Sequence, residues 1–184
     1  MKKYDYRFDT NLLQSFIGQT FQFYKHKKFM YTNTVSVWLE FMIKNRLFRL
    51  NNDFEEIDYF GWDDEATICQ LEEVDTSDSN NEENVVDTNV QEKIESIVLV
   101  DDHFCLTCYG KPEYDFWETR AIIFKFKEYE ISFEKQDSWF SLEIEMNRGY
   151  NLIDKIEDEK FILEDFNQID QQKLFVEREI KHLL

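Results

Sequence analysis

The chain has few of the residues that break or cross-link a fold. Its 184 residues include one Pro, four Gly and three Cys. With so little Gly, the hairpin turns are expected to use Asn, Asp, Lys and Glu in place of the tight Gly-containing types. Three cysteines, an odd number, argue against a secreted disulfide framework.

Long apolar runs and a phosphate-binding loop are also missing. No run approaches the roughly 20 apolar residues that a bilayer-spanning helix needs. The N-terminal MKKYDYRFDT has no apolar segment behind its lysines, as a signal peptide would require. Without a Gly-rich loop, nucleotide hydrolysis of the P-loop type is excluded. We therefore expect a cytoplasmic protein.

What the sequence does have is alternation of apolar and polar residues. Apolar residues make up 42% of the chain and include 18 Phe, which is enough for a substantial core. Alternation runs through Thr34–Phe60 and again through Thr119–Met146, where Ile122, Phe124 and Phe126 recur at every second position. A period of two with β-branched and aromatic residues predicts strands with one buried face.

The two alternating stretches predict two similar antiparallel β units, consistent with an internal duplication. Placing Phe21 on Val98 and Phe41 on Phe126 aligns the units, with the difference in offset absorbed by a loop. The expected divisions are residues 1–74 for the first unit, 75–92 for a flexible acidic linker, 93–155 for the second unit and 156–184 for a helix. The linker is polar and lacks aromatics, so it cannot bury enough apolar area to offset its ordering entropy.

Two helices complete the predicted α+β fold. Asp9 to Gln19 is expected to form a short helix capped by Asp9 or Thr10. The tail is expected to form a long helix packed on the sheets, because one apolar stripe recurs at steps of three, four and seven: Ile162, Phe166, Ile169, Val176, Ile180 and Leu183. A coiled coil through this helix, giving a homodimer or a scaffold, is the competing interpretation.

The acidic charge is concentrated in one segment. The net charge is −18, and residues 51–92 hold 15 of the 39 acids and no Lys or Arg, so the rest of the chain has 24 acids against 21 bases. Such a field repels nucleic acid and anionic membranes and favours a basic partner. A solvated linker is the alternative interpretation of the same segment.

The segment predicts a partner-binding site. We expect a non-enzymatic inhibitor that presents carboxylates where a basic, nucleic-acid-handling protein would receive phosphates, such as a phage anti-CRISPR protein against a Cas nuclease or an immunity protein against a nuclease toxin. Aromatic neighbours, including Phe54, would supply apolar anchors. Residues 53–60 fit a helix or a strand equally well. The expected binding residues are Asp53, Glu55, Glu56, Asp58, Tyr59, Phe60, Trp62, Asp63, Asp64 and Glu65.

One cluster could carry metal chemistry. His103, Cys105 and Cys108 have ligand types that suit zinc, with Cys69, His26 or Asp102 as a fourth ligand. On a continuous strand, however, Cys105 and Cys108 point to opposite faces. We expect no catalytic residues and no cofactor, with buried free cysteines as the preferred interpretation. A zinc site, and with it an unrecognised metal-dependent enzyme, is the alternative.

Overall fold

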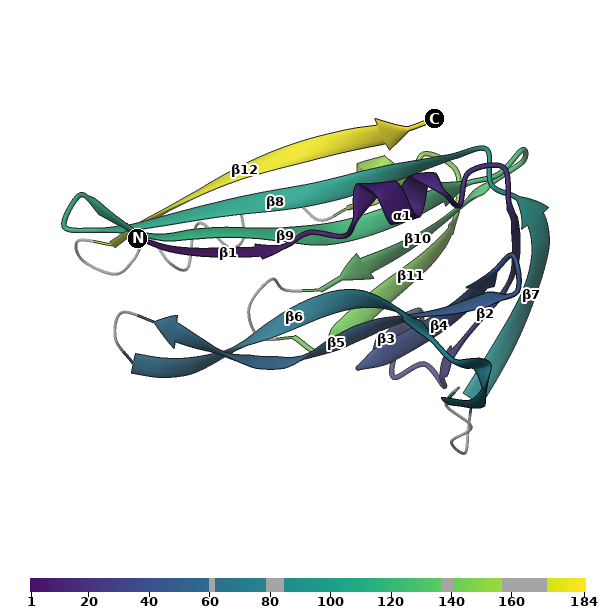
Figure 1. The fold of residues 1–184 in the computed structure, drawn as a ribbon, viewed down its shortest axis with the longest axis horizontal. Helices are drawn as coiled ribbons and strands as arrows, with labels where there is room; N and C mark the ends of the chain where they lie inside the picture. The colour runs from purple at the N-terminus through teal and green to yellow at the C-terminus, as the bar shows by residue number, and fades with distance from the viewer. Residues whose placement is uncertain (60–61, 79–84, 137–140, 157–171) are drawn as a thin grey trace.

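The computed structural model describes residues 1–59, 62–78, 85–136, 141–156 and 172–184. The fold is mostly β, with about 70% of the described residues in strands and 8% in helical turns. Two sheets lie one above the other (Figure 1). The strands are β1 (Lys2–Tyr6), β2 (Thr20–Lys27), β3 (Thr34–Ser36), β4 (Trp38–Ile43), β5 (Arg46–Tyr59), β6 (Trp62–Val74), β7 (Val85–Lys93), β8 (Ser96–Cys108), β9 (Lys111–Lys125), β10 (Glu130–Lys135), β11 (Glu143–Gly149) and β12 (Gln172–Leu183).

One sheet has the order β12-β8-β9-β10-β11-β3, with β1 parallel to β9, and the other has the order β6-β5-β4-β2-β7. The chain crosses between the sheets at Val37, whose φ of 72° lies in the left-handed region. The amide of Val37 donates to Leu142, and its carbonyl accepts from Asn52. Val37 therefore joins β3 of one sheet to β4 of the other.

The turns agree in part with the low Gly content. Lys44 and Asn45, both with positive φ, form the two-residue turn between β4 and β5, as a tight hairpin with primed geometry requires. The turn between β8 and β9 instead uses Tyr109 and Gly110, with φ of 51° and 73°. The expectation that hairpin turns avoid Gly is therefore confirmed for the β4–β5 turn and wrong for the β8–β9 turn.

The predicted hairpins of both β units are present and face one core. β4 pairs with β5, and β9 pairs with β10. Phe41 and Phe48 from the first hairpin, and Phe124 and Phe133 from the second, are buried together. The Phe41 ring lies 5.5 Å from that of Phe124 and 5.9 Å from that of Phe133. We call this cluster the main core.

The predicted long C-terminal helix is wrong, and with it the α+β class. Gln172–Leu183 is strand β12, which pairs antiparallel with β8 along its whole length. The helical spacing in this part of the tail rested on Val176, Ile180 and Leu183. Pairing with β8 overrides that spacing, because backbone hydrogen bonds and the burial of Leu174 favour the strand. Ile162, Phe166 and Ile169 lie outside the described residues.

The N-terminal helix is shorter than expected. α1 covers Thr10–Gln14, and the Asp9 side chain caps it by accepting the amide of Asn11. The chain then turns back at Gly18, whose φ is +79° and whose amide donates to the carbonyl of Ile94. Within the described parts of the chain, no helix is long and apolar enough to cross a membrane.

Part of the expected flexible linker is also a strand. Val85–Lys93 forms β7, which pairs antiparallel with β2 at the edge of the sheet. Val90 is half-buried and packs against the main core. The polar composition did not indicate this strand, because an edge strand needs little hydrophobic sequence.

Replacing Val90 with Asp is expected to lower the free energy of unfolding by about 1–3 kcal/mol, because the charge would lie against the core. Val86→Asp on the same strand is the matched control, since Val86 is more exposed, and it should change stability by no more than about 0.5 kcal/mol. Urea denaturation measures both. Equal and negligible effects would mean that β7 does not contribute to the fold.

A second core lies at the other end of the long strands. It contains Ile57 and Ile68 from β5 and β6, Phe104 from β8 and Phe116 from β9. Tyr4 and Tyr6 of β1 pack against it. We call this cluster the distal core.

Buried charges separate the two cores. Along β9, Phe116 belongs to the distal core and Ile122 to the main core, and Glu118 lies between them. Glu118 accepts a hydrogen bond of 3.0 Å from Lys135 of β10, and both side chains are almost fully buried. Burial raises the pKa of Glu118 and lowers that of Lys135. Such a pair contributes little net stability but makes the loss of one partner costly.

Candidate partner-binding site

A two-stranded arm carries most of the predicted binding residues. β5 pairs with β6 from Leu47 to Tyr59, but it pairs with β4 only as far as Asn51. We call residues 52–59 and 62–69 the arm. It extends along the lower layer in Figure 1. The open choice between helix and strand for residues 53–60 is therefore settled as strand through Tyr59.

One side of the arm is fixed to the rest of the protein. Ile57, Ala66 and Ile68 are buried in the distal core. Glu55 is half-buried and accepts a hydrogen bond from Tyr6 of the other sheet. The pKa of the Tyr6 hydroxyl is raised, mainly by burial and to a smaller extent by this hydrogen bond. Glu55 therefore takes part in a contact between the arm and the other sheet.

The ten predicted binding residues differ in their surroundings. Asp53, Glu56 and Glu65 are exposed on the arm, and Glu55 is turned toward Tyr6. Phe60 lies outside the described residues. The backbone of the remaining five belongs to β5 or β6: Asp58, Tyr59, Trp62, Asp63 and Asp64.

The base of the β5–β6 hairpin has its charges compensated. Arg46 of β5 donates to Glu73 of β6 at 2.8 Å through Nε. Arg49 contacts the fully buried Glu40 at 2.7 Å and Glu72 at 3.7 Å. Glu72 and Glu73 belong to the same acidic segment of the sequence as the arm, but they lie close to arginine side chains within the fold.

In the arm the register brings acid opposite acid. Glu56 is the cross-strand partner of Glu65, and Asp58 is the partner of Asp63. Like charges directly opposite each other destabilise an antiparallel pair. Phe54 adds an exposed aromatic side chain beside them, with 45% of its surface accessible. Sequence reasoning found these acids and Phe54, but it missed their cross-strand positions, which depend on strand register.

The candidate metal residues are not brought together. His103 and Cys105 lie on β8, and Cys108 is the last residue of that strand. His103 Nε2 lies 2.6 Å from Asp115 Oδ1, and its ring stacks on Trp117 at 4.1 Å. Over the described parts of the chain, no group of three potential ligands converges. The arrangement therefore gives no support to a zinc site.

The thiols of Cys69 and Cys105 are also poorly suited to nucleophilic chemistry. Cys69 is buried, and burial raises its pKa to about 12. Burial, together with Asp115 and Glu177, raises the pKa of Cys105. Since the thiolate is the reactive form, neither group is activated at neutral pH.

The fold and the arm together define a class: a two-sheet β protein with an acidic, two-stranded arm. No family model, curated protein or solved structure matches the chain.

Proposed function

We propose that the protein is a non-enzymatic, cytoplasmic inhibitor that binds a basic, nucleic-acid-handling protein through its arm. The observation that carries the proposal is the register of the arm, in which Glu56 opposes Glu65 and Asp58 opposes Asp63. Like charges at directly opposed positions of two strands repel each other and disfavour the pairing. A cationic partner would relieve that repulsion on binding.

Two further features favour a protein as the ligand. Phe54, exposed beside Asp53 and Glu56, supplies an apolar anchor of the kind that dominates protein interfaces. The distal core holds the arm against the opposite sheet, so little ordering entropy is lost on binding. Carboxylates in rows on a rigid hairpin can substitute for the phosphates of a nucleic acid.

Two partner types have the required chemistry. A Cas nuclease holds its guide and target in a positively charged channel, and a nuclease toxin must bind the phosphates of its substrate. The scaffold alternative is not retained, because the helix on which it depended is β12 in its described part.

Mutual exclusion with nucleic acid tests the proposal. The immobilised protein should capture a guide-free Cas nuclease, or an inactivated DNase toxin, from a purified panel. The same nuclease loaded with its guide or with a DNA duplex should be captured at least tenfold less, because phosphates then occupy the basic surface. Equal capture of the loaded and free forms would show that the arm does not take the place of phosphates.

A further inference from the structure

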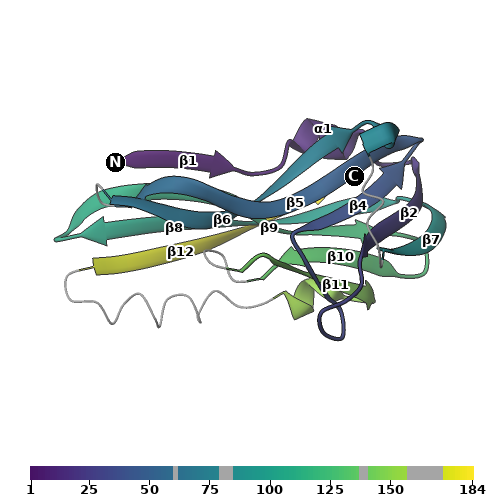
Figure 2. The same ribbon diagram turned by 90° about the horizontal axis from the view of Figure 1, so that it is seen from below.

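A second exposed surface lies in the loop between β2 and β3. Residues 28–33 join these strands, and Figure 2 shows the loop projecting at the lower edge of the view. Three consecutive large apolar side chains are exposed there: Phe29 by 39%, Met30 by 55% and Tyr31 by 67%. Clustered exposure of this kind is typical of an interaction site.

The loop is held in a defined conformation. The Phe29 ring stacks on the buried His26 at 4.5 Å, and the amide of Met30 donates to the carbonyl of Thr34. At its end, Asn33 donates to Glu145 of β11 at 3.0 Å. The loop therefore presents Met30 and Tyr31 from a fixed base, which lowers the entropy lost on binding.

The charge beside this loop is opposite to that of the arm. The sequence places Lys27 and Lys28 directly before Phe29. Lys25, from the same basic run, is buried against Glu40 at 3.2 Å, whereas Lys28 is exposed. The loop thus combines a cation with apolar side chains. A complementary partner surface would be acidic and would also expose an apolar side chain.

The arm of the same protein is such a surface. Glu56 is exposed on the same face of β5 as Phe54, and Asp53, which precedes Phe54 in the chain, is exposed as well. Phe54, Met30 and Tyr31 are all exposed within one copy, so the arm and the loop do not cover each other there. We propose that the loop of one copy docks on the arm of a second copy, in a head-to-tail assembly. Contacts of this heterologous kind build rings or open chains.

This assembly goes beyond the proposed function and competes with it for the arm. A copy whose arm is covered by another loop cannot offer that arm to a basic nuclease. Self-association would therefore keep the arm covered until a nuclease competes for it. The net charge of −18 opposes association, so the assembly is expected at physiological ionic strength, where charges beyond about 8 Å are screened.

Complementation between two variants tests this proposal. The loop variant is Lys28→Glu, Met30→Ser and Tyr31→Ser, which leaves the Phe29 stack on His26 intact. The arm variant is Asp53→Lys, Phe54→Ser and Glu56→Lys. All six positions are exposed, so both variants should have the same melting temperature as the wild type. Light scattering at 150 mM salt should show concentration-dependent association of the wild type and monomers of 22.6 kDa for each variant alone.

Mixing the variants retains one intact loop and one intact arm, so a species of about twice the monomer mass should appear. A mixture that stays monomeric, or a wild type that stays monomeric, would overturn the proposal. Binding of the loop to phosphatidylserine vesicles by a monomeric wild type would overturn it in favour of a membrane. The loop variant should still bind a basic nuclease, so failure here is distinct from failure of the proposed function. If either triple variant melts early, Tyr31→Ser and Phe54→Ser replace them with the same criteria.

Discussion

Replacing Lys135 with Met is expected to lower the free energy of unfolding by about 3–5 kcal/mol at pH 7. Lys135 Nζ lies 3.0 Å from Glu118 Oε2, and the two side chains are only 1% and 3% exposed. Removing the ammonium leaves a buried carboxylate without its nearest counter-charge. For a chain of this length the loss corresponds to roughly 6–20 °C in melting temperature.

The matched control removes both charges. Glu118→Leu with Lys135→Met should lie within about 1.5 kcal/mol of the wild type, because replacing a buried ion pair by apolar groups is often neutral. Urea denaturation measures the three proteins. A single variant as stable as the wild type, or a double variant as unstable as the single one, would contradict the role assigned to the pair.

The stability of the single variant should also depend on pH. The charged groups around Glu118 are Lys135, Arg120 and Asp102, and burial already raises the pKa of Glu118 with Lys135 present. Without Lys135 the folded state holds the Glu118 proton still more tightly than the unfolded state. The corresponding stability is present below the unfolded pKa of about 4.3 and is lost as the pH rises through the folded pKa. The deficit of the single variant relative to the double variant should therefore shrink between pH 7 and pH 4.5.

The strands of the main core could be predicted from the sequence because apolar residues recur at every second position, as Ile122 and Phe124 do in β9. The expectation of a single buried face is wrong for β9, because Ile123, which lies between them in the chain, is also buried, in a separate cluster with Leu152. The local pattern nevertheless predicts the strand. The same holds for Asp9, whose side chain caps α1 as its residue type predicts.

The edges of the sheets could not be predicted in this way. β7 is polar, and its pairing with β2 joins residues that are 58 to 73 positions apart in the chain. β12 has apolar residues at a spacing that suits a helix, but pairing with β8 determines its structure. Edge strands are specified by partners, and a single sequence does not contain that information in any local window.

The sequence predicts where the acidic residues of the candidate site lie in the chain, but it does not predict their contacts in the fold. Composition locates the acids between residues 51 and 92. Only the structure shows that Glu73 accepts a hydrogen bond from Arg46 and that Glu56 is the cross-strand partner of Glu65. The contact between Glu55 and Tyr6 joins two sheets, and no sequence pattern indicates it.

Charge reversal on the arm is expected to weaken binding of a basic nuclease at least tenfold, or about 1.4 kcal/mol. The variant is Glu56→Lys with Glu65→Lys, which converts the opposed acidic pair into a basic one. Truncating Phe54 to Ser in addition should weaken binding further, through faster dissociation. The charge contribution acts mainly on the association rate and should decline with rising salt.

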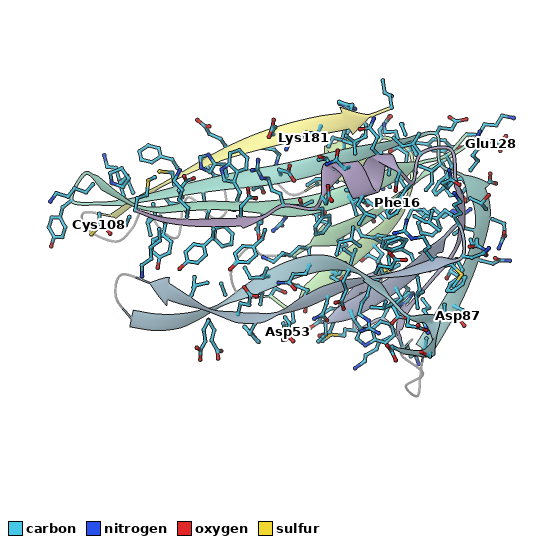
Figure 3. All side chains as sticks on the ribbon, viewed as in Figure 1. Phe16, Asp53, Asp87, Cys108, Glu128 and Lys181 are labelled. Carbon is cyan, nitrogen blue, oxygen red and sulfur yellow. The ribbon has the colours of Figure 1, made fainter. Side chains whose placement is uncertain are left out.

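The control must change net charge equally at another place. Glu92 and Glu128 are exposed and lie away from the arm, and Figure 3 shows Glu128 at the opposite end of the molecule from the arm, at the turn between β9 and β10. Glu92→Lys with Glu128→Lys shifts the net charge by the same amount as the arm variant. Any effect of overall charge is therefore common to both proteins.

The ratio of the dissociation constants of these two variants for one nucleic-acid-free basic nuclease, measured at 150 mM salt, is the most direct test of the proposed function. The proposal predicts an arm variant at least tenfold weaker than the wild type and a control within about twofold of it. Equal affinities for the two variants would contradict the proposal, because the arm would then contribute only its share of the net charge.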